Sequence, residues 1–286
     1  MATLKAIRKR ISSIRNTQQI TKAMKMVSAA KLRRAQEAAV QARPYADKMV
    51  ELLRNVAARV SQEAHPLLKA RDEKKIHLLL FTSDRGLCGG YNANLIRAAE
   101  AFIRREGAGK DIHLVLIGRK GADYFRRRRA QIADRHLNVL ATPAEELAAE
   151  IADKVIERFV KGETDAVYIV YSRFRSALSQ VPTLEKLLPV AIAETEDPTQ
   201  LTEYLYEPSV EALLASLLPK VAEVAILRAL LEATASEHGA RMTAMDSATS
   251  NASKMMETLT LQMNRARQAS ITRELMEIVG TAEALK

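Results

Sequence analysis

Glycine and proline, which interrupt helices, are concentrated in the middle of this 286-residue chain, and only Gly239 and Gly280 are glycines after residue 162. No glycine occurs before Gly86, proline is absent before Pro44 and after Pro219, and all twelve aromatic residues lie between Tyr45 and Tyr206. Long stretches without these residues are typical of long helices, whereas a middle rich in β-branched residues, aromatics and glycine is typical of a compact α/β domain. The sequence therefore predicts a long helix, a central α/β domain and a second long helix.

An apolar stripe at helical spacing runs along residues 3–43, which contain no helix breaker. It is formed, with a slip in register after its first four members, by Leu4, Ile7, Ile11, Ile14, Ile20, Met24 and Val27. We interpret the slip as a stutter in a coiled coil. Pro44 should kink or end the helix because its ring clashes with the preceding turn, and a further helical stretch is predicted over residues 45–61.

The C-terminal segment, from about residue 210 to residue 285, reads as a longer and more regular helix. Residues spaced three and four apart form a continuous seam of small and flexible side chains, namely Met242, Met245, Thr249, Ala252, Met256, Leu259, Met263, Ala266 and Ser270. Such a seam can pack closely against one partner helix. An ordinary helical-bundle core would show the same pattern, but the chain has no third long amphipathic helix to complete a bundle.

The apolar stripe of this helix changes face after Ser270, where its members become Ile271, Leu275, Ile278, Ala282 and Leu285. At about 1.5 Å per residue, residues 3–43 span about 60 Å and residues 210–285 span about 115 Å. Helices joined through a central domain most simply pair antiparallel, so the C-terminal helix should extend beyond its partner. Its apolar end then requires a sleeve formed by other chains.

The central segment alternates between strand and helix patterns. Short apolar runs predict strands at residues 76–81, 112–117 and 166–171, separated by helices at 93–105, 122–129 and 144–161. This alternation indicates a small doubly wound, Rossmann-like sheet, and residues 177–208 are interpreted as an extended excursion. The predicted fold is thus α/β with a long antiparallel coiled coil, divided into segments 1–61 (N-terminal helix), 72–208 (α/β domain) and 209–286 (C-terminal helix).

No motif of catalysis or cofactor binding stands out in the sequence. The glycine-rich turns at 86–90 and 118–121 lack the spacing of a dinucleotide fingerprint or a phosphate-binding loop, so tight turns between strand and helix explain them. The five histidines are scattered, and together with the single Cys88 they have no metal-ligand spacing. We therefore expect no catalytic, cofactor-binding or metal-binding residue, and the lone cysteine suggests a reducing compartment.

The net charge of +10 lies entirely in residues 1–36, which hold ten Lys or Arg and no acid, since the remainder holds 34 bases and 34 acids. A cleaved mitochondrial presequence could have this composition, but cleavage would remove the stripe that pairs with the C-terminal seam. Membrane-surface binding would require Trp or Phe on the apolar face, which has neither, and no apolar run approaches the about 20 residues of a membrane span. Nucleic-acid phosphates and the acidic loops of a protein partner remain about equally compatible with the composition.

Six motifs, spread over both ends and the middle of the chain, resemble those of the gamma subunit of the F-type ATP synthase. They are Asn16–Val27 (NTQQITKAMKMV), Thr82–Asn92 (TSDRGLCGGYN), Gln180–Thr183 (QVPT), Tyr204–Pro208 (YLYEP), Ser236–Met245 (SEHGARMTAM) and Asn264–Thr272 (NRARQASIT). The resemblance extends from Met1 to the C-terminus.

This resemblance implies a non-catalytic central rotor shaft that couples proton flow to ATP synthesis. The coiled coil would stand inside a hexamer of alternating alpha and beta subunits, which carry the ATP chemistry. The α/β domain would bind the epsilon subunit and the membrane ring of c subunits, so that membrane association is indirect, at the cytoplasmic face of the bacterial plasma membrane. No cofactor and no nucleic acid is implied. The alternative is a coiled-coil nucleic-acid-binding protein, which would bind DNA in a salt-dependent way without a co-purifying ATPase.

The family's contact residues can be carried over by motif. Contacts with the hexamer are expected at Lys22, Met24, Lys25, Arg265, Arg267 and Gln268, and, on charge more than on motif, at Arg8, Lys9 and Arg10. The tip in the family's apolar bearing would consist of Ile271, Leu275, Ile278 and Leu285. Chloroplast members carry a regulatory cysteine pair, and the single Cys88 excludes thiol switching of that kind. No role is assigned to the Asp84–Asn92 loop beyond its place in the α/β domain.

Overall fold

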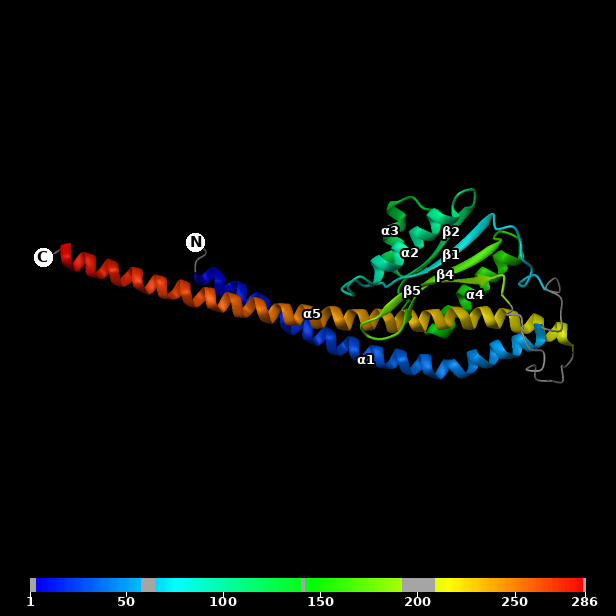
Figure 1. The fold of residues 1–286 in the computed structure, drawn as a ribbon, viewed down its shortest axis with the longest axis horizontal. Helices are drawn as coiled ribbons and strands as arrows, with labels where there is room; N and C mark the ends of the chain where they lie inside the picture. The colour runs from blue at the N-terminus through cyan, green and yellow to red at the C-terminus, as the bar shows by residue number, and fades with distance from the viewer. Residues whose placement is uncertain (1–3, 58–64, 140–141, 192–208, 285–286) are drawn as a thin grey trace. The chain divides into compact units, whose positions relative to one another are not determined.

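The computed structural model describes residues 4–57, 65–139, 142–191 and 209–284. Two long helices, α1 (Leu4–Ala57) and α5 (Val210–Ala284), enclose an α/β segment in the chain order, as predicted (Figure 1). The elements between them are β1 (Lys75–Phe81), α2 (Tyr91–Glu106), β2 (Asp111–Ile117), α3 (Arg119–Arg127), β3 (Ile132–His136), α4 (Ala144–Val160), β4 (Ala166–Phe174) and β5 (Gln180–Leu188). The Tyr204–Pro208 motif and Leu285 lie outside the described residues. Segments 1–61, 72–208 and 209–286 remain a predicted division.

Contacts between residues divide the chain into two compact units, each of which includes part of α1 and part of α5. The helix-pair unit consists of Met1–Ser28 and Met242–Lys286, and the α/β unit consists of Ala29–Arg241.

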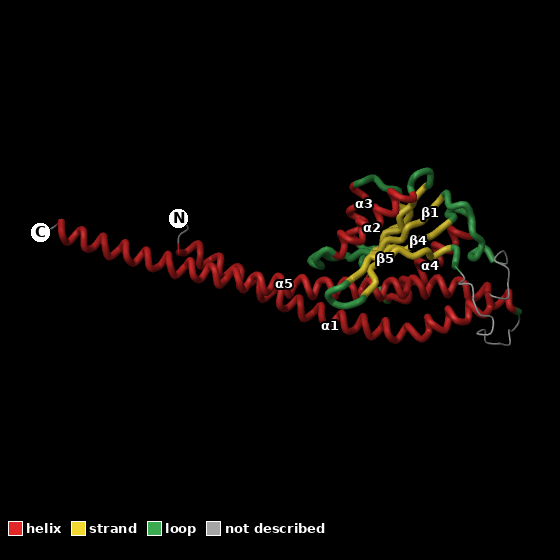
Figure 2. Tube along the Cα trace, in the orientation of Figure 1, coloured by secondary structure: helices red, strands yellow, loops and turns green. Residues whose placement is uncertain are grey.

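The strands of the α/β unit form one sheet in the order β3-β2-β1-β4-β5 (Figure 2). The first four are parallel, and β5 is antiparallel to β4 at the edge. This order, with β1 central and successive strands added to either side, confirms the predicted doubly wound sheet. Two strands, β3 and β5, were not predicted. β3 was missed because it has only five residues, three of which carry charged or titratable side chains.

Alternate side chains of the central strands pack into two separate cores, one on each face of the sheet. Leu78 and Leu80 of β1 lie with α2 and α3, whereas Leu79 and Phe81 lie with α4, the first half of α5 and the end of α1. All four side chains are at most 1% exposed. Such continuous burial is expected of a parallel strand covered by helices on both faces.

Pro44 does not end the first helix, so of the two predicted outcomes, a kink or a stop, the stop is wrong: α1 continues from Leu4 to Ala57 with the proline inside it. Buried residues occur on both sides of Pro44, with Leu32 before it and Leu53 and Val56 after it. An internal proline costs about 3 kcal/mol because it removes a backbone hydrogen bond. Burial of the apolar face beyond Pro44 offsets that penalty, since tertiary packing provides most of a helix's stability.

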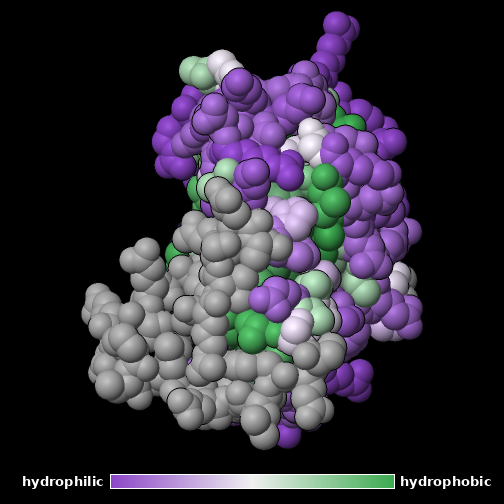
Figure 3. Space-filling view, turned by 90° about the vertical axis from the view of Figure 1, so that its right-hand side faces the viewer, coloured by the Kyte–Doolittle hydropathy of each residue, from purple (hydrophilic) through white to green (hydrophobic). Residues whose placement is uncertain are grey.

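On the face shown in Figure 3, hydrophilic side chains predominate and hydrophobic ones gather in a narrow band. Among the described residues, no helix combines the length and the apolar character that crossing a membrane requires.

Gly118 holds the turn between β2 and α3 in a conformation that only glycine adopts easily. Its φ is +91°, and an added Cβ would lie 2.0 Å from the carbonyl oxygen of Thr82. We expect Gly118→Ala to lower the free energy of unfolding by about 2–4 kcal/mol through strain and steric overlap. Urea unfolding measures the change. Gly109→Ala is the matched control because its φ is also positive but no atom lies within 4 Å of the added Cβ, so its loss should be clearly smaller.

Candidate functional site

The helix-pair unit is built on the predicted seam of α5. All nine seam residues from Met242 to Ser270 are buried or half-buried, and Met245 and Ala252 are only 5% and 6% exposed. Most residues between them are exposed. The seam prediction is therefore confirmed within this unit.

Polar side chains fix the register between the two helices of this unit. The Gln18 side-chain amide donates to the Ser253 hydroxyl over 2.7 Å, and the hydroxyls of Thr21 and Thr249 lie 2.7 Å apart. Lys25 forms an ion pair with Asp246. Because the α5 numbers fall as the α1 numbers rise, these contacts confirm an antiparallel pair.

The predicted stutter in α1 is wrong. Ile20 and Val27 are 61% and 56% exposed, whereas Thr21 and Ser28 are 8% and 3% exposed. The 4-3 spacing therefore continues without a slip from Ile14 through polar residues that face α5. The hydrogen bonds of Thr21 explain why a polar side chain is acceptable in the seam, because a satisfied buried hydroxyl avoids the desolvation penalty of an unpaired one. Ile20 and Val27 are left as exposed apolar groups.

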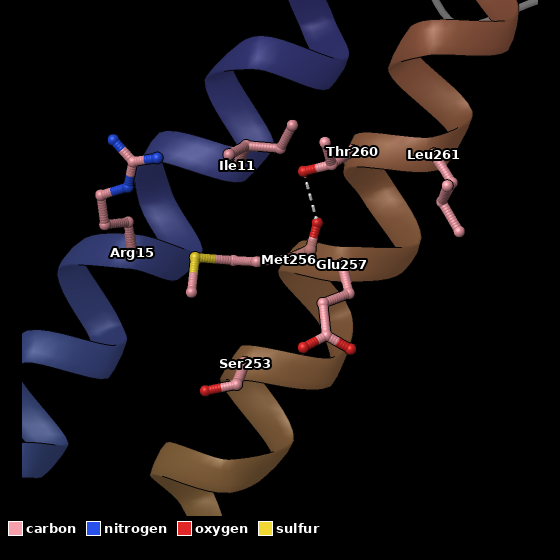
Figure 4. Close-up of a pocket in the computed structure, with 7 residues that line it drawn as sticks. All are labelled: Ile11, Arg15, Ser253, Met256, Glu257, Thr260 and Leu261. Carbon is pink, nitrogen blue, oxygen red and sulfur yellow. Dashed lines mark hydrogen bonds between the residues drawn. The ribbon is translucent and has the colours of Figure 1, made fainter.

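Two shallow grooves flank the helix pair. One, of about 660 Å³, is lined by Ile11, Arg15, Ser253, Met256, Glu257, Thr260 and Leu261. In Figure 4, Met256 of α5 points toward α1 at its centre, and Arg15 and Glu257 provide groups of opposite charge. The other, of about 550 Å³, includes Arg10, Ile14 and the 54% exposed Met255. These shallow grooves have an apolar floor and a charged rim, which is typical of a protein–protein contact, whereas a small-molecule site encloses most of its ligand.

The residues expected to contact a partner lie on the surface of the helix-pair unit. Seven of them are exposed, namely Arg8, Lys9, Arg10, Lys22, Arg265, Arg267 and Gln268. Met24 and Lys25 are half-buried, and Lys25 is already paired with Asp246. Ile20 and Val27 were not predicted to contact a partner, because they were assigned to the apolar stripe of α1 that faces α5. An unbroken 4-3 count from Ile7 through Thr21 to Ser28 would have placed them outside it.

The end of α5 is apolar and exposed on every side. Continuing the observed register places Leu4 level with about residue 267, and Figure 1 shows α5 extending past the N-terminal end of α1. Every described side chain from Ile271 to Thr281 is exposed, including Leu275 (57%) and Ile278 (64%). Met276 (67%) and Val279 (56%) were not in the predicted tip but belong to the same exposed end. A concentration of exposed apolar side chains of this kind marks a surface that a partner covers.

The Thr82–Asn92 loop lies at the carboxyl end of β1, where doubly wound sheets commonly bind ligands. Here the crevice is occupied by the chain itself: the Tyr91 hydroxyl donates to the carbonyl of Ala233 in α5 over 3.1 Å. The cavity left between them, beside Phe81 and Leu230, holds about 20 Å³, which is room for about one water molecule. A nucleotide does not fit in this space.

Asp84 gives this loop a structural role that the sequence did not reveal. Its carboxylate accepts hydrogen bonds from the backbone amides of Arg119 (3.0 Å), Asn138 (3.0 Å) and Val139 (2.8 Å). One side chain therefore connects three loops at the same edge of the sheet through hydrogen bonds.

In the part of the chain that the structure describes, no cluster of three or more His, Cys, Asp or Glu side chains could hold a metal ion.

Comparisons with known proteins agree on one family. A family model described as ATP synthase matches residues 3–285. The ATP synthase gamma chains of Geobacter sp. (strain M21) and Geobacter metallireducens are both 53% identical over the full length of both chains. A chain from the central stalk and c-ring structure of the Tetrahymena thermophila mitochondrial ATP synthase is 26% identical, with a TM-score of 0.61, and the match covers 80% of this chain and 99% of that one. A chain of the Euglena gracilis mitochondrial ATP synthase shares the fold, with a TM-score of 0.70 at 21% identity over 99% and 94% of the two chains.

Proposed function

This chain belongs to the family of ATP synthase gamma chains, and we propose that it turns within the synthase as the shaft of the central stalk. In this role it couples proton flow through a membrane ring of c subunits to conformational cycling of an alpha–beta hexamer that makes ATP. The same coupling runs in reverse during ATP hydrolysis. The chain performs no chemistry itself.

The observation that carries this proposal is the exposed apolar end of α5. Fully burying a side chain such as Leu or Ile contributes about 1.5–3 kcal/mol, and this chain leaves Ile271, Leu275 and Ile278 in solvent. A hexamer with an apolar central bearing supplies the missing cover. Leu285 belongs to the same proposed tip.

Polar and charged residues along the helix pair provide a second kind of contact. Their neighbours in the hexamer are proposed to be acidic loops of the beta subunits, which match the excess positive charge of residues 1–36. The residues that make these contacts are Arg8, Lys9, Arg10, Lys22, Met24, Lys25, Arg265, Arg267 and Gln268. Exposed ion pairs are individually weak, at about 0–1 kcal/mol, so the shaft can exchange one set of partners for another as it turns.

The α/β unit is proposed to bind the epsilon subunit and the c-ring. It would thereby connect the shaft to the membrane sector from the cytoplasmic face of a bacterial plasma membrane. The chain would be a peripheral component there, held by its partner subunits.

Reconstitution tests this function directly. The purified chain should hydrolyse no ATP, and alpha and beta subunits with the membrane sector should pump protons on ATP addition only when the chain is present. Full ATP-driven pumping in a preparation shown to lack the chain would contradict the shaft role. ATP turnover by the highly purified chain alone would contradict its non-catalytic status.

A further inference from the structure

A short stretch of α5 is buried on every side within the α/β unit. All seven residues from Ala235 to Arg241 are buried, and Ser236, Glu237, His238 and Arg241 are between 0% and 8% exposed although they are polar. Seven consecutive residues cover about two turns of a helix, so no face of these turns reaches solvent. A helix on the surface of a sheet normally keeps one polar face exposed.

The Thr82–Asn92 loop holds one side of this stretch through Arg241. The guanidinium donates to the backbone carbonyls of Arg85 (3.3 Å) and Gly86 (3.2 Å). Burial lowers the pKa of His238 to about 4, so its ring is neutral near pH 7 and its Nδ1 can accept from Arg241 Nη1 over 3.3 Å. Arg241 Nη2 also lies 2.7 Å from Glu237 Oε1, an ion pair without hydrogen-bond geometry.

The β4–β5 hairpin holds another side. The Ser236 hydroxyl donates to the carbonyl of Ser172 over 2.9 Å. Gly239 faces the hairpin so closely that an added Cβ would lie 3.2 Å from the Phe174 ring and 3.4 Å from the Ala177 backbone. The loop and the hairpin together form a collar around residues 235–241.

We propose that this collar is the coupling point at which the α/β domain grips the shaft, and that Arg241 is the positioning residue that fixes the rotation of α5 within it. This inference rests on the proposed shaft function. The Arg241 guanidinium donates to two adjacent backbone carbonyls, those of Arg85 and Gly86. Both belong to the loop that Asp84 anchors at the edge of the sheet. A twist of α5 about its own axis would break these hydrogen bonds, so torque applied to the α/β domain passes to the helix. These directional hydrogen bonds add to the apolar packing that holds the first half of α5 in the core of the α/β unit.

A pair of variants separates this role from a simple effect on stability. Arg241→Met removes the three hydrogen bonds to the loop but leaves the Glu237 carboxylate buried without its partner. Combining Arg241→Met with Glu237→Gln also removes that carboxylate charge, and replacing both members of a buried ion pair is often nearly neutral for stability. Arg126→Met is the matched control because Arg126 is exposed and pairs with Asp123 on the surface of α3.

The measurement is the ratio of proton pumping to ATP hydrolysis in vesicles carrying the complete reconstituted synthase, together with the melting temperature of each full-length chain. We expect the double variant to recover most of the melting temperature lost in Arg241→Met while both lower the ratio by half or more, and the control to match the parent chain. A normal ratio in the double variant would overturn the inference. Failure of the parent chain itself to support pumping would instead count against the proposed function.

Discussion

Removal of every residue after Ser270 is expected to leave the melting temperature of the isolated chain almost unchanged and to strongly impair the assembled synthase. The side chains described in this segment, from Ile271 to Thr281, are all exposed, so deleting these eleven side chains removes no buried apolar surface from the isolated chain. If the deleted side chains belonged to a core, each would contribute about 1.5–3 kcal/mol, and the chain would melt far earlier. Within the hexamer the same deletion removes the proposed bearing contact.

A thermal melt of the truncated chain, beside ATP hydrolysis and pumping by the complex that contains it, tests this expectation. The matched control is Glu274→Gln with Glu277→Gln, which changes exposed charges on the same turns and leaves the apolar residues in place. This control should behave like the parent chain in both assays. A large drop in the melting temperature of the isolated truncated chain would show that the tip is part of a core within the chain.

Reversal of the exposed positive charges of α1 should have the second large effect. Replacing Arg8, Lys9, Arg10 and Lys22 with Glu puts four negative charges opposite the proposed acidic loops. Exposed pairs are worth about 0–1 kcal/mol each, so the four together should weaken binding to alpha–beta complexes about 10- to 100-fold. Because salt screens exposed charges, the difference from the parent chain should shrink as the ionic strength rises. Each single reversal should change little.

A control with the same net charge isolates the position of these residues. Reversing Arg97, Arg104, Arg126 and Arg127, which are exposed on α2 and α3 of the α/β unit, also lowers the net charge from +10 to +2. Binding to alpha and beta subunits alone should remain close to that of the parent chain in this control. Equal weakening by both sets would mean that total charge matters and that the α1 residues make no specific contact.

The sequence was sufficient for the long helices, the α5 seam and the doubly wound sheet, because each depends on a repeated pattern of apolar residues. β5 escaped prediction for a local reason: Pro182 lies within it, and proline lowers strand propensity except at an edge. The structure places β5 at the edge, where it pairs with β4 alone.

Errors in the helix pair came from equating the seam with apolar residues. Thr21 occupies a seam position because its hydroxyl reaches Thr249, and this pairing across 228 positions leaves no local trace in the sequence. The collar was missed for a similar reason, since Arg241 binds backbone carbonyls of Arg85 and Gly86 that carry no residue-type signal. The sequence pattern identified the faces on which α1 and α5 pack, but tertiary contacts determined which side chains of those faces are buried and which stay exposed.

Rotation of single molecules tests the shaft function most directly. An alpha–beta hexamer fixed to a surface would hold the chain, and a visible rod would be attached through Ala108→Cys, an exposed site in the turn between α2 and β2. The native Cys88 is 2% exposed and should not compete for the label. On addition of ATP, the rod is predicted to turn continuously in one direction. ATP hydrolysis at a normal rate with a stationary rod, in complexes shown to contain the labelled chain, would contradict the shaft function.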